Sequence, residues 1–232
     1  TTYLASVRQS YLQFLFKALG LPFLPTYTDA QFKTKTRLSQ HNEITFLGLT
    51  GIDNMKLNTN LTGEKAEYIL SYLPTVKQET FTLGSVYKHY AGAHIQTVVL
   101  SHSYLNNHLT KYLRNDESNP DNLTLKYGSL EQETKLRVEN VSTFGAVKVS
   151  FGANLDHTQY SNNTFQKAYT DQSKTYKYHT FLDMLRWGFF GTMNYESPDE
   201  RMTVSLGVRG DACNYTSQMN KLNNQLSPRL SL

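Results

Sequence analysis

The sequence predicts an all-β protein: part of an antiparallel, up-and-down transmembrane β-barrel, with about ten strands in this chain. Three observations support this fold class: period-two alternation of apolar and polar residues, strict alternation of short and long connections, and segments of ten or more residues. The expected strands are 2–8, 28–39, 43–52, 77–90, 93–106, 124–139, 145–159, 176–195, 200–211 and 226–232.

The clearest alternation is AVKVSFGANLD, residues 146–156, in which Val147, Val149 and Phe151 share one side of a strand. Lys148, Asn154 and their neighbours of the same parity share the other side. A soluble β-sandwich points such an apolar side into its core, whereas a membrane barrel points it into lipid. The strand alone is therefore compatible with either architecture.

The connections favour the membrane barrel. Short turns are expected near 39–43, 90–93, 140–144 and 197–200, and they alternate with longer connections near 9–27, 53–76, 107–123, 160–175 and 212–225. Outer-membrane barrels have short periplasmic turns and long external loops, whereas a sandwich has no physical reason to gather its short turns at one end. Several expected strands are also long enough to cross a bilayer at a tilt, while globular strands usually have five or six residues. We therefore expect the apolar sides to face lipid.

The composition excludes several classes of protein. A net charge of +4 over 232 residues, with Lys and Arg spread along the strands, argues against nucleic-acid binding. A single cysteine, Cys213, excludes an intramolecular disulfide framework and a thiolate metal cluster. His94, His102 and His108 share parity but are spaced over roughly 20 Å or more of strand, so no metal site and no cofactor are expected.

The two ends of the chain have no feature of a mature terminus. TTYLASVRQS lacks the charged region and cleavage site of a signal peptide, and the chain starts and stops within strand-like patterns. We expect residues 1–232 to form part of a single barrel domain, with the signal peptide and the last strands outside this sequence. Residues 10–25 have helical spacing, with Leu12, Leu15, Phe16 and Leu19 on one stripe, and predict a short helix at the barrel rim.

Two segments resemble the barrel hairpins of TonB-dependent outer-membrane receptors of Gram-negative bacteria. They are YTDAQFKTKTRLSQHNEITFLGLTGIDN (27–54) and MTVSLGVRGDACNYTSQMNKLNNQLSPRLSL (202–232). The resemblance implies a 22-stranded barrel closed by an N-terminal plug, and import of a siderophore, vitamin, glycan or peptide powered by TonB. It also implies several partners: TonB, the protein's own plug, outer-membrane lipid, a small ligand and, in some members, a surface lipoprotein. It implies no bond chemistry.

Two groups of residues are candidates for function under this interpretation. The polar sides of the strands predict a lumen wall that also contacts the plug, formed by Lys33, Lys35, Arg37, Glu131, Glu133, Lys135, Arg137, Glu139, Lys148, Asn154, Asp156 and Arg209. Tyrosines in or beside the long connections predict the ligand-binding side: Tyr68, Tyr72, Tyr104, Tyr112, Tyr160 and Tyr215. Aromatic residues at strand ends, Trp187 among them, are also suited to the girdles at the lipid headgroups.

Two other interpretations remain open from the sequence. A small outer-membrane barrel enzyme of the omptin type would hold acidic and histidine side chains at its rim, and Asp156, His157, His179, Asp183 and Asp211 are candidates. Adjacent Asp156 and His157 point to opposite sides of a strand, which opposes a shared site. A soluble β-sandwich or lectin-like binding module is the third interpretation.

Overall fold

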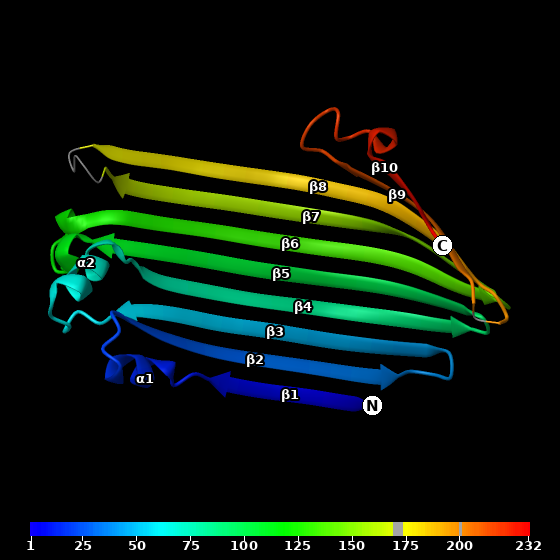
Figure 1. The fold of residues 1–232 in the computed structure, drawn as a ribbon, viewed down its shortest axis with the longest axis horizontal. Helices are drawn as coiled ribbons and strands as arrows, with labels where there is room; N and C mark the ends of the chain where they lie inside the picture. Colours follow the sequence, from blue (N-terminus) through cyan, green and yellow to red (C-terminus); the bar gives the residue numbers. More distant parts are fainter. Residues whose placement is uncertain (169–173, 200) are drawn as a thin grey trace.

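The strands form one continuous antiparallel sheet in a computed structural model that describes residues 1–168, 174–199 and 201–232 (Figure 1). Each strand pairs only with its neighbours in sequence, in the order β1 to β10. The strands are β1 (Thr2–Gln9), β2 (Phe23–Arg37), β3 (Asn42–Leu57), β4 (Thr75–Ala91), β5 (His94–Tyr112), β6 (Leu123–Phe144), β7 (Val147–Lys167), β8 (Thr175–Glu196), β9 (Thr203–Cys213) and β10 (Leu226–Ser231). The helices are α1 (Leu12–Ala18), α2 (Glu64–Tyr72) and three 3₁₀ turns, η1 (Leu113–Asn115), η2 (Pro120–Asn122) and η3 (Leu222–Gln225).

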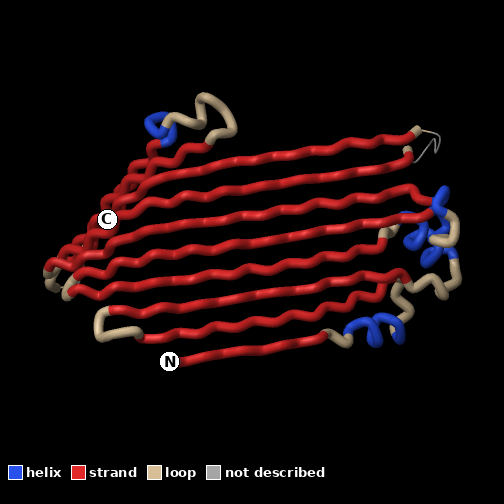
Figure 2. The backbone as a smooth tube through the Cα atoms, turned by 180° about the vertical axis from the view of Figure 1, so that it is seen from behind, coloured by secondary structure: helices blue, strands red, loops and turns tan. Residues whose placement is uncertain are grey.

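Short and long connections lie at opposite ends of the sheet, as predicted (Figures 1 and 2). Gly92 and Gly145 begin two-residue hairpin turns with φ of 61° and 57°, a left-handed conformation that costs glycine little. At the other end lie the connections that contain α1, α2 and η1 with η2, whereas the connection that contains η3 leaves β9 near the middle of β8, where Cys213 pairs with Arg186 (Figure 2). The up-and-down topology and the number of strands predicted from the sequence are confirmed.

The sheet is a single layer without a core. Among the described residues, the only buried hydrophobic residues are Leu70, Ala212 and Cys213, and each of them is 5% exposed. A soluble sandwich needs a second sheet and a packed interior between the two. The sandwich interpretation is therefore wrong for this chain.

The register of the sheet separates an apolar face from a polar face. Directly paired residues point to the same side of a sheet, so Leu155 shares the apolar face with Leu136 on β6 and Trp187 on β8. On β7 this face is apolar from Val147 to Leu155, roughly 26 Å of strand, which is close to the span of a tilted strand in a bilayer. Beyond Leu155 the same face of β7 becomes polar.

The apolar part of this face on β7, together with the apolar residues at the same level on the neighbouring strands, is called the apolar band. It consists of Phe46, Leu83, Val98, Leu100, Leu136, Val138, Val147, Val149, Phe151, Ala153, Leu155, Leu185, Trp187, Phe189, Met193, Val204, Leu206 and Val208.

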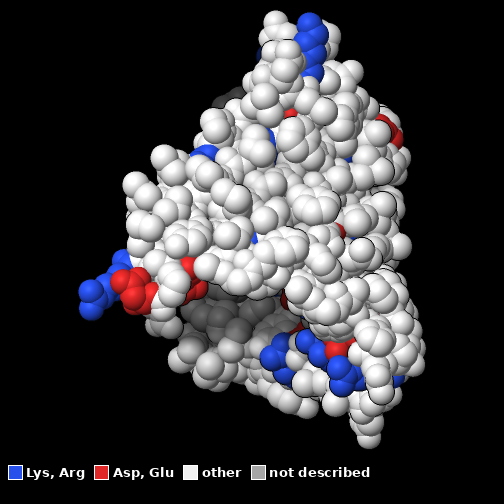
Figure 3. Space-filling model, turned by 90° about the vertical axis from the view of Figure 1, so that its right-hand side faces the viewer, with Lys and Arg blue, Asp and Glu red and all other residues white. Residues whose placement is uncertain are grey.

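The sheet is curved, with the polar face on its inner side. β9 pairs with the edge of β8 that faces away from β7, yet β9 and β10 overlap β7 and β8 in Figure 1, so the sheet turns out of its plane. On a curved sheet the side chains of the concave side converge and shield one another. Phe151 of the apolar face is 55% exposed, whereas the Asp156 side chain of the polar face is 18% exposed. Viewed from the short-turn end, the surface is mostly uncharged, and its charged side chains gather in a few groups (Figure 3).

The helices lie in long connections at one end of the sheet. α1 confirms the predicted rim helix, and Phe16 packs edge-on against Phe23 at the start of β2, with ring centroids 5.4 Å apart. α2 lies in the segment 53–76, for which a connection was predicted but no helix. In the described part of the chain, no helix combines the length and the apolarity needed to cross a membrane.

Several strands extend further toward the long connections than predicted. β3 continues to Leu57, β5 to Tyr112 and β7 to Lys167, so these strands take up the first residues of the segments expected as loops near 53–76, 107–123 and 160–175. The reason is physical: above the apolar band both faces are polar, and the hydrophobic alternation that predicts a strand disappears while the hydrogen-bonded ladder continues.

Candidate functional site

The polar face collects every residue that the sequence analysis assigned to the lumen wall. The register pairs Asp156 with Lys135 and Asn154 with Arg137, and it continues from strand to strand as far as β2 and β9. The residues on this face are Lys33, Lys35, Arg37, Glu131, Glu133, Lys135, Arg137, Glu139, Lys148, Asn154, Asp156 and Arg209. Their common orientation follows from the fold; their contact with a lumen or a plug stays a prediction.

Arg186 joins the charges of three strands. Its Nη2 lies 2.8 Å from Glu133 Oε1 on β6 and 3.6 Å from Asp156 Oδ2 on β7. Lys135 Nζ lies 2.7 Å from the second oxygen of Glu133. Sequence reasoning missed Arg186, although its parity within β8, opposite Asp156, is the signal that places it on the polar face.

Two further charged groups lie beside this cluster. Arg137 Nη2 lies 3.1 Å from Glu139 Oε2, and its guanidinium carbon is 4.5 Å from the centroid of the Phe190 ring. Arg209 Nε lies 2.5 Å from Asp211 Oδ2. A hollow of about 320 Å³ is lined by Asn154, Asp156, Arg186, Arg209 and Asp211, together with residues near the 214–225 connection. The wall therefore offers paired charges, which form hydrogen bonds without a strong net field.

The polar face of β2 and β3 has a different charge balance. Lys35 Nζ lies 2.9 Å from Glu43 Oε2. For Lys33 and Arg37, by contrast, the described residues supply no ion pair. This part of the wall is basic, so it is electrostatically suited to an acidic surface.

The candidate ligand-binding tyrosines are spread over several positions. Tyr68 and Tyr72 form an edge-on pair on α2, with centroids 5.5 Å apart and exposed fractions of 68% and 53%. Tyr215 lies in the connection after β9, and Tyr112 is the last residue of β5. Tyr104 lies within β5, as the expected strand 93–106 places it, and Tyr160 lies within β7 and not in the connection expected near 160–175, because β7 is longer than predicted.

Tyr104 and Tyr160 also differ in the face they occupy. Tyr104 is on the apolar face and stacks on Phe81, with ring centroids 4.9 Å apart. Tyr160 is on the polar face, where its hydroxyl accepts a hydrogen bond of 3.3 Å from Asn162 Nδ2. Of the two, Tyr160 is the one whose position is compatible with contact to a ligand inside the barrel.

Lys111 fixes α2 to the wall. It is only 7% exposed, and its ammonium donates to the carbonyl oxygen of Leu70, to the carbonyl oxygen of Leu73 at 3.0 Å and to Asn115 Oδ1 at 2.5 Å. Asn115 Nδ2 in turn donates to the Leu70 carbonyl at 3.2 Å. A cation at the C-terminal carbonyls of a helix is electrostatically favourable. This contact joins the 58–74 and 113–122 connections and was not predictable from the alternating pattern of β5.

Asp116 organises the connection after β5 locally. Its carboxylate accepts hydrogen bonds from the hydroxyl of Ser118 at 2.6 Å, the backbone amide of Ser118 at 3.0 Å and Asn122 Nδ2 at 2.9 Å. These hydrogen bonds, the Ser118 hydroxyl first, hold the pKa of Asp116 below its usual value. The external connection is therefore an ordered turn and not an unstructured loop.

The acidic and histidine residues of the enzyme interpretation do not come together at one rim. His157 Nε2 lies 3.1 Å from Asp183 Oδ1 on the apolar-face side, whereas Asp156 is on the polar face with Arg186. His179 contacts Asn163, and Asp211 contacts Arg209. In the part of the chain that the structure describes, no three His, Cys, Asp or Glu side chains are grouped as metal ligands.

Solved outer-membrane transporters have the same fold. The outer-membrane transporter YddB from Escherichia coli has a TM-score of 0.62 and 10% identity over 90% of this chain and 29% of its own. The RagAB peptide transporter has a TM-score of 0.60 and 9% identity, covering 88% of this chain and 29% of its own. The copper transporter OprC has a TM-score of 0.59 and 10% identity, covering 90% and 33%. No protein-family model and no curated protein matches the sequence.

These structures are TonB-dependent outer-membrane transporters, and the chain spans about a third of their length or less. At such low identity the likeness establishes the fold alone. The chain therefore has the fold of a section of an outer-membrane β-barrel wall, which confirms the fold class predicted from the sequence.

Proposed function

We propose that this chain is an internal part of the single barrel domain of a TonB-dependent receptor, which imports a scarce nutrient across the Gram-negative outer membrane. The observation that carries the proposal is the coreless curved sheet, with an apolar band on one face and ion-paired charges on the other. The apolar band needs lipid to cover it, and the ion-paired charges need a polar interior. The similarity in fold to solved transporters supports the same class.

The transport path follows from the two groups of candidate residues. A siderophore, vitamin, glycan or peptide would meet the external connections, where Tyr68, Tyr72 and Tyr215 are available for stacking. It would then pass along the polar face once the plug rearranges under the action of TonB. The basic stretch around Lys33 and Arg37 is suited to an acidic plug surface, and a surface lipoprotein is a further partner by analogy with the fold. The work is binding and conformational change, without bond chemistry.

Fractionation of cells that express the full-length native protein is the first test. We expect recovery in the outer membrane and a gel mobility that changes on heating, because folded barrels resist detergent until they are heated. Deletion of the gene, or of the TonB gene, is then expected to abolish growth on a limiting nutrient found by screening siderophores, vitamins, glycans and peptides. Recovery in a soluble fraction without a heat-dependent shift would contradict the barrel. Uptake that persists without TonB would contradict the transport class.

A further inference from the structure

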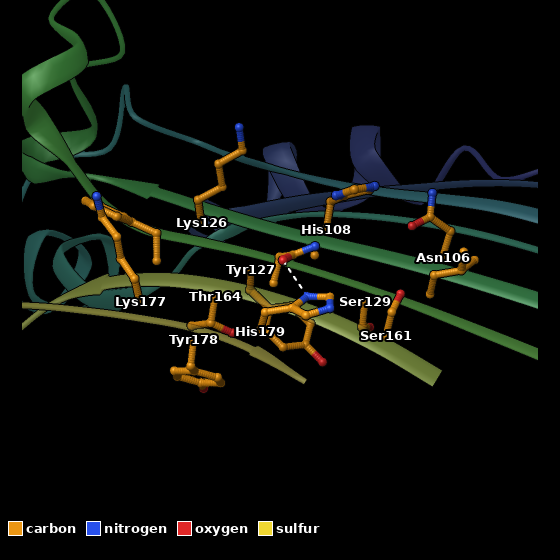
Figure 4. A pocket seen from close by; sticks show the side chains of 14 residues that line it. Asn106, His108, Lys126, Tyr127, Ser129, Ser161, Thr164, Lys177, Tyr178 and His179 are labelled. Atoms are coloured by element: carbon orange, nitrogen blue, oxygen red, sulfur yellow. Dashed lines mark hydrogen bonds between the residues drawn. The ribbon is translucent and has the colours of Figure 1, made fainter. Parts of the chain in front are cut away.

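Three tyrosines project from the polar face between the charged wall and the long connections: Tyr127 on β6, Tyr160 on β7 and Tyr178 on β8. Tyr127 and Tyr178 are both paired with Thr164 of β7, so their side chains lie on the same side of the sheet. Tyr178 points away from Lys126, which projects on the apolar-face side (Figure 4). We name Tyr127, Tyr160 and Tyr178 the tyrosine platform. Tyr127 and Tyr178 are two strand spacings apart, roughly 10 Å, so one elongated ligand can contact both.

Three buried polar side chains hold two of the rings in place. Asn162 is 5% exposed, and Ser129 and Thr164 are each 6% exposed. Asn162 Nδ2 donates to the Tyr160 hydroxyl at 3.3 Å, and the Thr164 hydroxyl donates to Asn162 Oδ1 at 2.8 Å. The Tyr127 hydroxyl interacts with Ser129 and Tyr160. Because the rings are already ordered, a ligand that stacks on them costs little side-chain entropy.

The strands around the platform offer one cation, and it is already bound. From the level of Tyr160 to the long connections, the described polar-face residues of β4 to β8 include two charged side chains, Lys111 and Glu131. The Lys111 ammonium donates to carbonyl oxygens at the end of α2. Glu131 is exposed, is paired in register with Tyr160, and forms no ion pair within the described part of the chain. An anion at this level would therefore meet a carboxylate without a compensating cation.

An uncharged polar row crosses the sheet at the level of the platform. It is paired in register from β4 to β8 and consists of Gln78, Asn107, Ser129, Asn162 and Thr180. Gln78 and Asn107 are half-buried, and Thr180 is exposed. Their amide and hydroxyl groups both donate and accept hydrogen bonds, whereas the tyrosine rings offer apolar faces. The wall at this level is therefore suited to an uncharged ligand with flat apolar faces and many hydroxyl groups.

We propose that the tyrosine platform and the uncharged polar row bind a neutral oligosaccharide. The C–H faces of its sugar rings lie on Tyr127 and Tyr178, and its hydroxyl groups form hydrogen bonds with Gln78, Asn107 and the Glu131 carboxylate. A peptide or an anionic iron chelate carries a negative group that these strands do not neutralise. The inference rests on the proposed function and deepens it, because it selects one substrate class among the four.

The test uses the full-length native protein, purified in an amine-oxide detergent, because a detergent with a sugar head group would compete for the site. Isothermal titration measures binding of maltohexaose, cellohexaose, xylohexaose and mannohexaose, with hexagalacturonate as the anionic counterpart. We expect at least one neutral hexasaccharide to bind and hexagalacturonate not to bind. Binding of hexagalacturonate alone, or of none of the five, would overturn the proposal.

Variants on β8 locate the site. Tyr178→Ala is expected to weaken binding of that hexasaccharide by roughly tenfold, whereas Tyr178→Phe keeps the ring and is expected to bind as the wild type does. The matched control is Phe181→Ala, which removes an equally exposed ring from the opposite face of the same strand and is expected to leave binding unchanged. Heat-dependent gel mobility verifies that the three variants are folded. Wild-type affinity in Tyr178→Ala, or an equal loss in Phe181→Ala, would overturn the proposal.

The outcome is separable from that of the proposed function, because binding is measured without transport. Growth on a peptide or an anionic chelate that depends on the gene and on TonB, in a protein that binds no neutral hexasaccharide, would reject only the oligosaccharide. Binding of a neutral hexasaccharide through Tyr178, with uptake that continues when TonB is deleted, would reject only the importer.

Discussion

Arg186 on β8 reaches across β7 to Glu133 on β6, with 2.8 Å between Nη2 and Oε1. The pair is partly screened, since the two side chains are 44% and 21% exposed, so its contribution to stability is modest. We expect Arg186→Gln to lower the free energy of unfolding of the full-length barrel by about 1 kcal/mol, measured by urea denaturation in lipid vesicles.

A double-mutant cycle isolates that pair. Glu133→Gln in the Arg186→Gln background is expected to cost less than Glu133→Gln alone, because the partner is already absent. Lys148→Gln on the same face is the control with an expected change near zero. Additive effects of the two substitutions would show that the contact contributes nothing to stability.

The assignment of the faces can be tested with neighbouring residues on β7. Phe151→Arg places a charge in the middle of the apolar band, and we expect a loss of about 2–4 kcal/mol in the stability of the barrel in the membrane. Ser150→Arg, one residue away on the polar face, is expected to be tolerated. The yield of heat-modifiable protein in the outer-membrane fraction reports both. A higher yield for Phe151→Arg than for Ser150→Arg would show that the two faces of the sheet are assigned the wrong way round.

Lys111→Met removes the contact between α2 and the wall. The carbonyl of Leu73 loses its charged donor and that of Leu70 keeps only Asn115, at a local cost of about 1.5–3 kcal/mol. We expect amide hydrogen exchange across 64–73 to accelerate by roughly tenfold or more, while β5 remains protected. Lys126→Met, on the opposite face, serves as the control. Unchanged exchange in α2 would show that packing of Leu70 alone holds the helix.

The two faces also separate the candidate tyrosines. Tyr72→Ala removes half of the exposed pair on α2, and we expect roughly tenfold weaker binding once the ligand is identified, the size of effect found for a central aromatic contact. Tyr104→Ala, stacked on Phe81 at the apolar face, is expected to leave binding unchanged. Isothermal titration with the purified receptor measures both, and an equal loss in the two variants would exclude a specific role for α2.

The basic stretch of the polar face makes a prediction about the plug. Lys33→Glu/Arg37→Glu is expected to repel an acidic plug surface and to raise the permeability of cells to a large antibiotic that the wild-type barrel excludes. Lys126→Glu/Lys177→Glu carries the same charge change on the outside and is expected to leave permeability unaltered. If the polar-face variant stays sealed, the plug is not held by these charges.

The fold was predictable from the sequence because alternation and connection length are local signals. The segment 146–156 shows the two faces directly, and the pattern of turns shows that the apolar face needs lipid. The extensions of β5 and β7 were not predictable, because above the apolar band both faces are polar and their strand character comes from the hydrogen-bonded ladder.

Contacts between distant parts of the chain were the hardest to predict. The parity of the charged residues placed all the wall candidates on one face, yet the bridge from Arg186 to Glu133 depends on side-chain reach across an intervening strand. The contact of Lys111 with α2 depends on how a connection folds back, which no periodicity of β5 encodes. A groove of about 690 Å³ that includes His108, Lys126, Asn163 and Lys177 combines residues of four strands with ordinary sequence spacing.

The pairing of each strand only with its sequence neighbours has a consequence for how such walls change in evolution. Every hairpin carries its own turn, Gly92 and Gly145 among them, and its register is set within the hairpin. A duplicated hairpin can therefore be inserted beside its parent without altering the pairing of the others. The circumference of the wall, and with it the width of the space that the wall encloses, can grow in steps of two strands while each existing face keeps its chemistry.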